Sequence, residues 1–413
     1  MKHLADEFVA VVKSPDPERI YCYSPGICVL PTGRLVATMD FGGPGVKDMQ
    51  GHVDYNGNDR PYIGEVFLSD DGGKTWRHTA TRSLFQMRPF LAGGPLYALG
   101  HAGDLAVIRS DDDGETWSGV HLLTSGQKWH QAPSNVWYKG DCVYLVMERR
   151  MHDRTPWAVC AHAPVLMRAK VTDDLTRRES WTFASEIVFE ENVDENNLPD
   201  WGIPFMPNVP GGNLAGIHMG WLETNVVQLL KKNDWFYDPT GKTFHLFMRQ
   251  FTGLSWTGSM LKVVEQEDGS MLTQFEYAPS GKRMVFTRIP GGGESKFHIL
   301  YDEKTQTYWL LTNEKMDSMV DSNKMTPRQR SGYDRSRLVL YYSLNCFDWI
   351  FAGVVAAGHN LYQSRSYASM AFCGEDLLVL SRTGDENAYN GHDTNIISFH
   401  RVKHFRDLID AEW

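Results

Sequence analysis

The clearest signal of architecture lies in residues 66–76, which read Val66-Phe67-Leu68-Ser69-Asp70-Asp71-Gly72-Gly73-Lys74-Thr75-Trp76. A second stretch repeats this pattern 41 residues further on, as Val107-Ile108-Arg109-Ser110-Asp111-Asp112-Asp113-Gly114-Glu115-Thr116-Trp117. Both have a short run of β-forming residues followed by S-x-D-x-G-x-T-W. The pattern predicts a hairpin turn in which the aspartate accepts backbone N–H groups, the glycine adopts a positive φ and the tryptophan packs back onto the sheet. Its recurrence indicates a repeating sheet unit.

This turn is the Asp-box, and two full copies at this spacing resemble the sialidase superfamily of β-propellers. Degenerate copies lie at Ser343-Leu344-Asn345-Cys346-Phe347-Asp348-Trp349 and at Thr172-Asp173-Asp174-Leu175, which runs on to Trp181. The resemblance implies that these turns lie on the outer rim of a propeller. They therefore predict the fold and leave the chemistry of the central funnel open.

Short strands joined by polar turns fill the remaining chain, and long amphipathic helical stretches are nearly absent. Grouped in fours, the strands predict blades near residues 20–80, 84–125, 130–185, 220–280, 296–356 and 365–403. The last group has only three strands, so residues 8–12 would supply the fourth and close the ring. A pair of β-sandwiches or a jelly roll is the alternative that the repeated turn disfavours. We expect one all-β domain over residues 1–413, a β-propeller of six four-stranded antiparallel blades, with seven as the alternative count.

Composition narrows the class of function. The net charge of −10, without a long run of Lys or Arg, argues against a nucleic-acid partner. No apolar window reaches the length of a membrane span, and residues 1–7 lack a signal-peptide core, so we expect a cytoplasmic protein. Six cysteines without a CxxC pair indicate free thiols, and we expect neither metal nor cofactor. The 13 Trp and 17 Tyr include side chains suited to stacking on sugar rings.

The first predicted blade carries both a family resemblance and a departure. Sialidases have a Y/F-R-I-P motif here, whereas this chain reads Tyr23-Ser24-Pro25-Gly26-Ile27, with Ser24 in place of the arginine. The pattern S-P-x-I-x-x-L-P-x-G-x-L-x-A-x-x-D-F-x-G that starts at Ser24 is similar to the propeller families of ulvan lyases, rhamnose–glucuronate lyases and related α-L-rhamnosidases. The rhamnosidases have a catalytic His in the segment matching Thr38-Met39-Asp40, where this chain has Met39.

Further matches to those families, including Trp129-His130-Gln131-Ala132-Pro133, point to catalytic residues. The resemblance implies that His130 faces the funnel, where an imidazole can act as base or acid. Glu223 lies among apolar residues and is either an acid/base group or the partner of an arginine, with Arg249 as that arginine. Arg149 and Arg150 alternate across one strand, so only one faces the funnel. We assign Arg150 to catalysis with His130 and Glu223, and Arg149 to substrate binding.

Pairs at a spacing of two supply the remaining substrate contacts. Lys296 with His298, and Arg365 with Tyr367, begin predicted inner strands and share a face in each case. We group them with Arg249 and with His101, a loop histidine beside Asp104. His101 and His392 read as turn contacts before metal ligands, because a metal needs several such groups to converge.

These residues predict a carbohydrate-active enzyme that cleaves glycosidic bonds in uronate- or deoxy-sugar-containing glycans, with an oligosaccharide as partner. Elimination needs a base, a proton donor and a cation on the carboxylate. Exo-hydrolysis needs two opposed acidic groups or a His in place of one. A propeller that binds glycan or protein without turnover is one alternative. An exo-sialidase is another, and it requires a second arginine to replace the one absent at Ser24.

Overall fold

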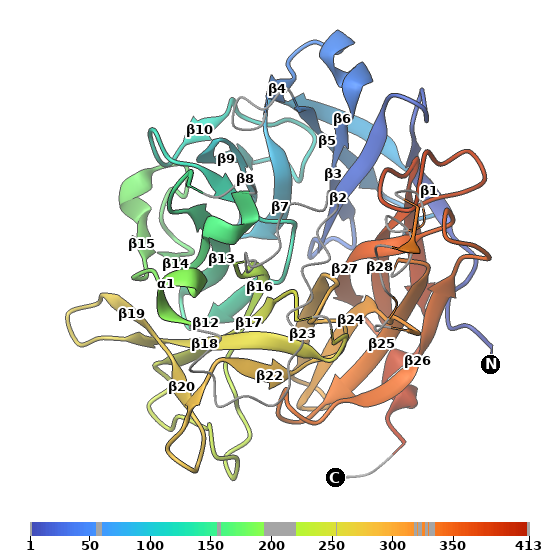
Figure 1. Cartoon of the computed structure of the whole chain (residues 1–413). Helices are drawn as coiled ribbons and strands as arrows, with labels where there is room; N and C mark the ends of the chain where they lie inside the picture. The colour runs from blue at the N-terminus through green and yellow to red at the C-terminus, as the bar shows by residue number, and fades with distance from the viewer. Residues whose placement is uncertain are drawn as a thin grey trace.

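Strands account for nearly all regular structure in the computed structural model of this chain, which describes residues 2–54, 60–154, 158–193, 220–252, 254–317, 320, 324–326, 329 and 335–410. The strands form six blades arranged around a central axis (Figure 1). The predicted six-bladed, all-β propeller is therefore confirmed, with blades close to the expected boundaries. No helix in the described part of the chain is long and apolar enough to cross a membrane.

Each blade begins with an innermost strand and runs outward. The first blade comprises β2 (Tyr21–Val29), β3 (Leu35–Gly42), β5 (Pro61–Ser69), β4 (Val53–Asp54) and β6 (Arg77–Arg82). The second comprises β7 (Phe85–Leu91), β8 (Leu96–Ala102), β9 (Asp104–Ser110) and β10 (His121–Leu122). The third comprises β11 (Trp129–His130), β12 (Trp137–Lys139), β13 (Cys142–Arg150), β14 (His162–Lys170) and β15 (Trp181–Phe183). The fourth blade comprises β16 (Leu222–Val227), β17 (Thr243–Arg249), β18 (Thr257–Glu265), β19 (Met271–Gln274) and β22 (Phe286–Arg288). The fifth comprises β23 (Phe297–Asp302), β24 (Thr307–Asn313), β25 (Arg337–Ser343) and β26 (Ile350–Ala357). The sixth comprises β27 (Arg365–Cys373), β28 (Asp376–Thr383), β29 (Ile396–Val402) and β1 (Val9–Lys13).

The remaining described elements are short. A small ribbon pairs β20 (Glu276–Tyr277) with β21 (Arg283–Met284), and α1 spans Phe189–Asn192. Four 3₁₀ turns lie at Pro44–Asp48, Ala158–Ala161, Arg178–Ser180 and Phe405–Leu408.

The N-terminal strand closes the ring. In β1, Val9 is paired with Phe399 and Ala10 with Ser398 of β29, so the outermost strand of the last blade comes from the start of the chain (Figure 1). Before it, the backbone N–H groups of Leu4 and Ala5 donate to carbonyls of β26 in the neighbouring blade. The predicted closure is confirmed. It joins the two ends of the sequence in one sheet, which leaves the propeller without an open seam.

The predicted Asp-box turns join the third and fourth strands of their blades. Asp71 Oδ1 accepts the backbone N–H groups of Lys74 and Thr75, each at 2.9 Å. The degenerate copy after β25 keeps this geometry, because Asn345 Oδ1 accepts two backbone N–H groups and Trp349 donates to the Cys346 carbonyl at 3.1 Å. Cys346 has a φ of 62° where the full copies have glycine. The turn therefore depends on the polar acceptor and the tryptophan more than on glycine itself.

Four inner strands contain a β-bulge, which changes the direction of side chains near the propeller axis. Pairing with the second strand slips in β2, β7, β16 and β27. Each slip contains one non-glycine residue with a positive φ, namely Ser24 (50°), Gln86 (55°), Glu223 (53°) and Tyr367 (52°). Such a backbone costs about 1–3 kcal/mol per residue and turns a side chain that a regular strand would direct elsewhere.

Candidate active site

The bulged residues gather at one end of the axis, where the first residues of the inner strands meet. Contacts between blades define this end: Gln86 of the second blade lies against His130 of the third, and Arg249 of the fourth blade lies against Tyr367 of the sixth. The last residues of β2, β7 and β27, together with residues of β23, line a separate cavity toward the other end. We call the first group of side chains the axial site.

His130 is paired in register with Glu148 of β13, and its Nδ1 lies 3.4 Å from Glu148 Oε2. Glu148 is fully buried, and its other oxygen accepts the backbone N–H and hydroxyl of Thr224 at 2.9 and 2.8 Å. Gln131 Nε2 donates to that oxygen at 3.1 Å. The carboxylate is therefore held rigidly, while the His130 side chain is 16% exposed and faces the axial site.

Gln86 determines which nitrogen of His130 carries the proton. A backbone N–H can only donate, so the Gln86 atom 3.0 Å from Gln131 N must be the amide oxygen. The same oxygen lies 2.7 Å from His101 Nε2, which must then carry a proton. The Gln86 NH₂ group faces His130 Nε2 at 3.3 Å and donates to it. In neutral His130 the proton is therefore on Nδ1, directed at Glu148, and Nε2 keeps a basic lone pair.

Two further imidazoles flank His130. The ring of His162 stacks on it with centroids 5.0 Å apart, and neither nitrogen of His162 has a hydrogen-bond partner among the described residues. Burial, together with the neighbouring His130, lowers the pKa of His162 and of His101 well below the usual range. Both rings are therefore neutral. His162 was not among the predicted site residues, because a histidine that begins a buried strand reads as core.

Glu223 and Arg249 form a buried ion pair on the fourth blade that also contacts the sixth blade. Arg249 Nη1 lies 3.2 and 3.1 Å from the two carboxylate oxygens of Glu223 and 3.0 Å from the Tyr367 hydroxyl. Burial by itself would raise the pKa of Glu223, but Arg249 and His130 reverse this and hold it below its ordinary value. Glu223 is thus ionised, and of the two roles left open by the sequence the arrangement gives it that of arginine partner.

A second guanidinium lies beside the position where the arginine of the sialidase motif is absent. Arg382, at the end of β28, lies 4.2 Å from the ring centre of Tyr23 and 4.8 Å from that of Tyr367. The Tyr23 hydroxyl is 2.5 Å from Asp393 Oδ1, which also contacts His392 Nδ1 at 2.6 Å. Burial lowers the pKa of Arg382, although not enough to discharge a guanidinium.

Asp40 is a buried residue whose carboxyl group contacts the backbone of the axial site. It is fully buried, and both its oxygens accept the backbone N–H of Gln86, at 2.9 and 3.0 Å. Burial raises the pKa of this carboxyl well above its ordinary value. Because Asp40 binds the strained residue of the β7 bulge, its role is to hold Gln86 in place.

The other predicted residues lie at the edge of this arrangement or outside it. Arg150 is on the Glu148 face of β13, with its Nε 3.0 Å from Asp153. Arg149 is on the opposite face, and its Nη1 lies 2.7 Å from Glu186. Arg365 donates to the Gly384 carbonyl at 3.0 Å and stacks on Phe8, away from the axial site.

Lys296 and His298 lie one after the other along the central channel of the propeller, which the inner strands surround. Lys296 is buried, and its Nζ donates to the Ala368 carbonyl at 2.6 Å. Burial lowers the pKa of Lys296 to about 7. His298 lies deeper, in the separate cavity, where burial and Lys296 lower its pKa well below the usual range. Of this pair, only Lys296 is electrostatically coupled to Glu223 of the axial site.

Only one cluster among the described residues has donor atoms spaced for a metal ion. His152, Glu190 and Glu191 present ligand atoms within 4.8 Å of one another, but both carboxylates are exposed. Such acidic clusters are common on protein surfaces, and none of these three residues is among the axial-site residues. We assign no ligand to it.

Comparison with known proteins places the fold. No protein-family model and no curated protein matches the chain. Solved structures match nearly its whole length: an α-L-arabinanase from Penicillium chrysogenum complexed with arabinobiose has a TM-score of 0.51 and 13% identity, covering 99% of each chain. A mutant of the α-L-arabinofuranosidase arb93a from Fusarium graminearum, complexed with an iminosugar inhibitor, has a TM-score of 0.52 and 12% identity, covering 97% of this chain and 98% of that one.

The NanB sialidase from Streptococcus pneumoniae gives a TM-score of 0.52 and 11% identity, covering 96% of this chain and 70% of the other. A protein of unknown function from Dyadobacter fermentans is as similar, with a TM-score of 0.51 and 13% identity. At these identities the likeness shows a sialidase-like β-propeller fold. The similarity to lyase and rhamnosidase propellers stays a prediction.

Proposed function

We propose that this chain is a carbohydrate-active enzyme that cleaves a glycosidic bond in a glycan containing a carboxylate-bearing sugar, with the axial site as its active site. One observation carries the proposal. Arg249 and Arg382 reach Tyr367 from two different blades, so two guanidinium groups and a phenol meet beside one ionised carboxylate. Guanidinium groups recognise carboxylates through paired N–H donors. The structural neighbours include proteins named as arabinanase, arabinofuranosidase and sialidase, which supports a sugar substrate.

Elimination is the reaction that these groups support best. Arg249 and Arg382 would bind the uronate carboxylate and stabilise the negative charge that develops when the proton on C5 is removed. His130 Nε2 would take that proton as the C5–H bond breaks, while Glu148 stabilises the resulting imidazolium. The electron pair forms the C4–C5 double bond, and the C4–O bond breaks. The Tyr367 hydroxyl would give its proton to the departing oxygen.

Hydrolysis is the second candidate, favoured by the position of Tyr367. Sialidases use a tyrosine nucleophile instead of a carboxylate. Here Arg249 Nη1 lies 3.0 Å from the phenol oxygen and would stabilise it as a phenolate. Arg382 would take over the role of the arginine that Ser24 replaces. The exo-sialidase alternative is consistent with this arrangement.

One experiment separates these reactions. The protein is incubated with uronate-containing oligosaccharides and with a fluorogenic sialoside, and products are followed by the ultraviolet absorbance of an unsaturated uronate and by fluorescence. We expect the absorbance to rise, and His130→Gln to abolish the rise while His121→Gln, an exposed edge-strand control, retains it. Fluorescence without absorbance would favour hydrolysis. Tight binding of a glycan without any product would instead support the non-catalytic alternative.

A further inference from the structure

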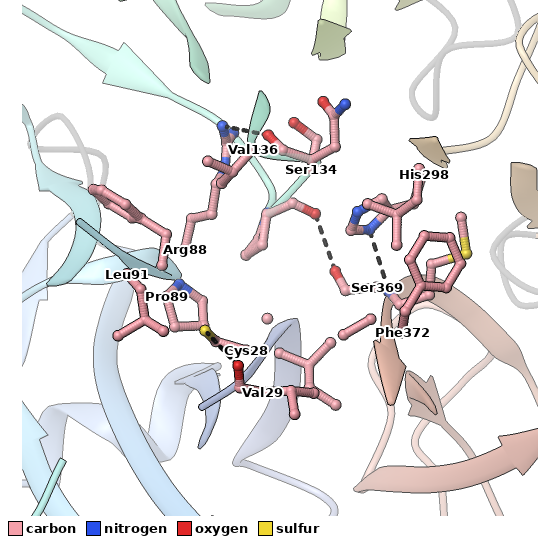
Figure 2. Close-up of a pocket in the computed structure, with 18 of the residues that line it drawn as sticks. Cys28, Val29, Arg88, Pro89, Leu91, Ser134, Val136, His298, Ser369 and Phe372 are labelled. Carbon is pink, nitrogen blue, oxygen red and sulfur yellow. Dashed lines mark hydrogen bonds between the residues drawn. The ribbon is translucent and has the colours of Figure 1, made fainter. Parts of the chain in front are cut away.

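A second cavity of about 400 Å³ lies toward the end opposite the axial site, where β2, β7 and β27 end. Figure 2 shows its lining, to which β23 also contributes. The walls are largely apolar and include Val29, Leu91, Val136, Leu300 and Phe372. The volume lies within the range of small-ligand sites, roughly 300–1,000 Å³. None of its lining residues belongs to the catalytic group proposed above, so the cavity needs a separate explanation.

Arg88 is the unusual member of this lining. It is only 2% exposed, and it donates to the carbonyls of Asn135 at 3.2 Å and Val146 at 2.9 Å. A guanidinium has five N–H groups, and no carboxylate among the described residues lies within hydrogen-bond distance of this one. Nε has no partner at all in that part of the chain. Burying a cation without a counter-ion is strongly unfavourable, and an anion bound in the cavity would compensate the charge of Arg88.

The groups around Arg88 do not neutralise its charge. Lys296 and His298 both interact electrostatically with Arg88. Glu148, a carboxylate that interacts electrostatically with Arg88, already accepts hydrogen bonds from Thr224 and Gln131. Burial lowers the pKa of Arg88 to about 10, which leaves it charged at neutral pH.

His298 adds a directed donor to the cavity. Its Nδ1 accepts the backbone N–H of Met370 at 3.3 Å, so the proton of the neutral ring is on Nε2. The ring lines the cavity on the side opposite Arg88 (Figure 2). Ser369 adds no free donor there, because its hydroxyl is directed at the carbonyls of Pro25 and Pro133. A ligand would therefore meet one guanidinium and one imidazole N–H, with apolar walls beyond them.

We propose that this second cavity binds a small carboxylate with an apolar body, whose charged group pairs with Arg88 and accepts from His298 while its hydrocarbon lies among Val29, Leu91 and Phe372. The apolar walls exclude a sugar, whose hydroxyls would lose their hydrogen bonds there. The single cation with few remaining donors suits a monoanion better than a phosphate ester. The cavity is thus a ligand site distinct from the axial site, and its occupancy does not depend on the reaction proposed above.

Octanoate and octan-1-ol test the proposal as a matched pair, with binding measured by calorimetry on the full chain. We expect octanoate to bind with an affinity at least about tenfold above that of octan-1-ol, and Arg88→Met to remove this difference. Arg88→Met replaces a buried cation by an apolar side chain of similar length, so the variant is expected to fold, which its thermal unfolding checks.

Two further variants locate the binding site. Ala371→Phe places a bulky ring in the cavity lining and should abolish octanoate binding, whereas Arg249→Met, in the axial site, should leave it unchanged. Equal affinity for acid and alcohol, or loss of octanoate binding in Arg249→Met, would overturn the proposal. So would an absence of octanoate binding at millimolar concentration in the unmodified protein.

Discussion

Replacing Gln86 by Glu should favour the charged, imidazolium form of His130. The glutamine oxygen that accepts from Gln131 N and His101 Nε2 is conserved in the glutamate, so the new carboxylate keeps both donors. Its other oxygen takes the place of the NH₂ group and faces His130 Nε2 across about the same 3.3 Å. The substitution therefore changes a donor into an anionic acceptor at one point of the axial site while preserving the shape of the side chain.

The size of the effect follows from this distance. Two opposite unit charges about 3.3 Å apart attract by about 5 kcal/mol at an effective dielectric constant of about 20. Gln86 and His130 are both partly exposed, so solvent screening reduces this, and a carboxylate this close shifts a titration by about one to two pH units. If neutral His130 is the base, the acidic limb of the kcat/KM profile moves to higher pH by that amount. Activity below the limb then falls about 10- to 100-fold, while the plateau at high pH changes less.

Two measurements read this out. One is kcat/KM between about pH 5 and 9 on a uronate oligosaccharide, with Gln50→Glu as a control that adds the same charge at an exposed turn. The other is the nitrogen NMR spectrum of ¹⁵N-histidine-labelled protein, in which His130 is identified by its loss in His130→Gln. We expect an Nδ1-protonated neutral ring in the unmodified protein and a doubly protonated ring over a wider pH range in Gln86→Glu.

The NMR result needs no substrate, so the tautomer and the proposed reaction can fail separately. An Nε2-protonated ring in the unmodified protein would refute the hydrogen-bond assignment around Gln86, whatever the activity. The expected tautomer together with an unmoved acidic limb would instead show that His130 is not the base.

Other variants probe the arginine contacts, the buried lysine and the rim. Arg382→Lys loses the planar stack on Tyr23 and Tyr367, and we expect KM for a carboxylate substrate to rise about 10- to 100-fold, with a smaller change for its methyl ester. Burial lowers the pKa of Lys296 from 10.5 to about 7, so between these pH values Lys296 is protonated in the unfolded state and neutral in the folded state. The free energy of unfolding should therefore rise with pH by up to about 1.4 kcal/mol per unit. Urea denaturation of Lys296→Met should lack this increase, and an equal slope would contradict the assignment. Asp112→Ala removes three hydrogen bonds of an Asp-box turn and should lower the urea midpoint, by about 1–2 kcal/mol in stability, without changing kcat/KM.

The fold could be predicted because its signals are local and repeated. Each Asp-box specifies its own turn through side-chain contacts within seven residues, and the strand patterns between the turns give the blade count. Ring closure followed from the same count, since a blade with three strands needs a fourth. The degenerate copy at Cys346 shows how far this signal can weaken while the turn persists.

The axial site could be predicted only in part, for residues on the innermost strands. The sequence predicts His130 and Tyr367 from their place at the start of inner strands, and Glu223 from its position among apolar residues. Arg382 and Asp40 lie on second strands, where the sequence offers no sign that a side chain reaches the axis. Glu148 immediately precedes Arg149 and Arg150, and the sequence offers no sign that this carboxylate is the group that contacts His130.

The bulges explain why strand alternation predicts some of these residues and misplaces others. Lys296 immediately precedes β23 and His298 is the second residue of that strand, which pairs without a register slip. Both side chains therefore face the channel, as a spacing of two predicts. Arg365 and Tyr367 have the same spacing but flank the start of the β27 slip, and they point to Phe8 and to Arg249 respectively. A positive φ at a non-glycine residue is unfavourable in isolation, yet it recurs at Ser24, Gln86, Glu223 and Tyr367, all at the same end of the axis. Such strain is retained where the direction of a side chain matters more than backbone stability. The residues that depart from the strand pattern are therefore the ones to test for function.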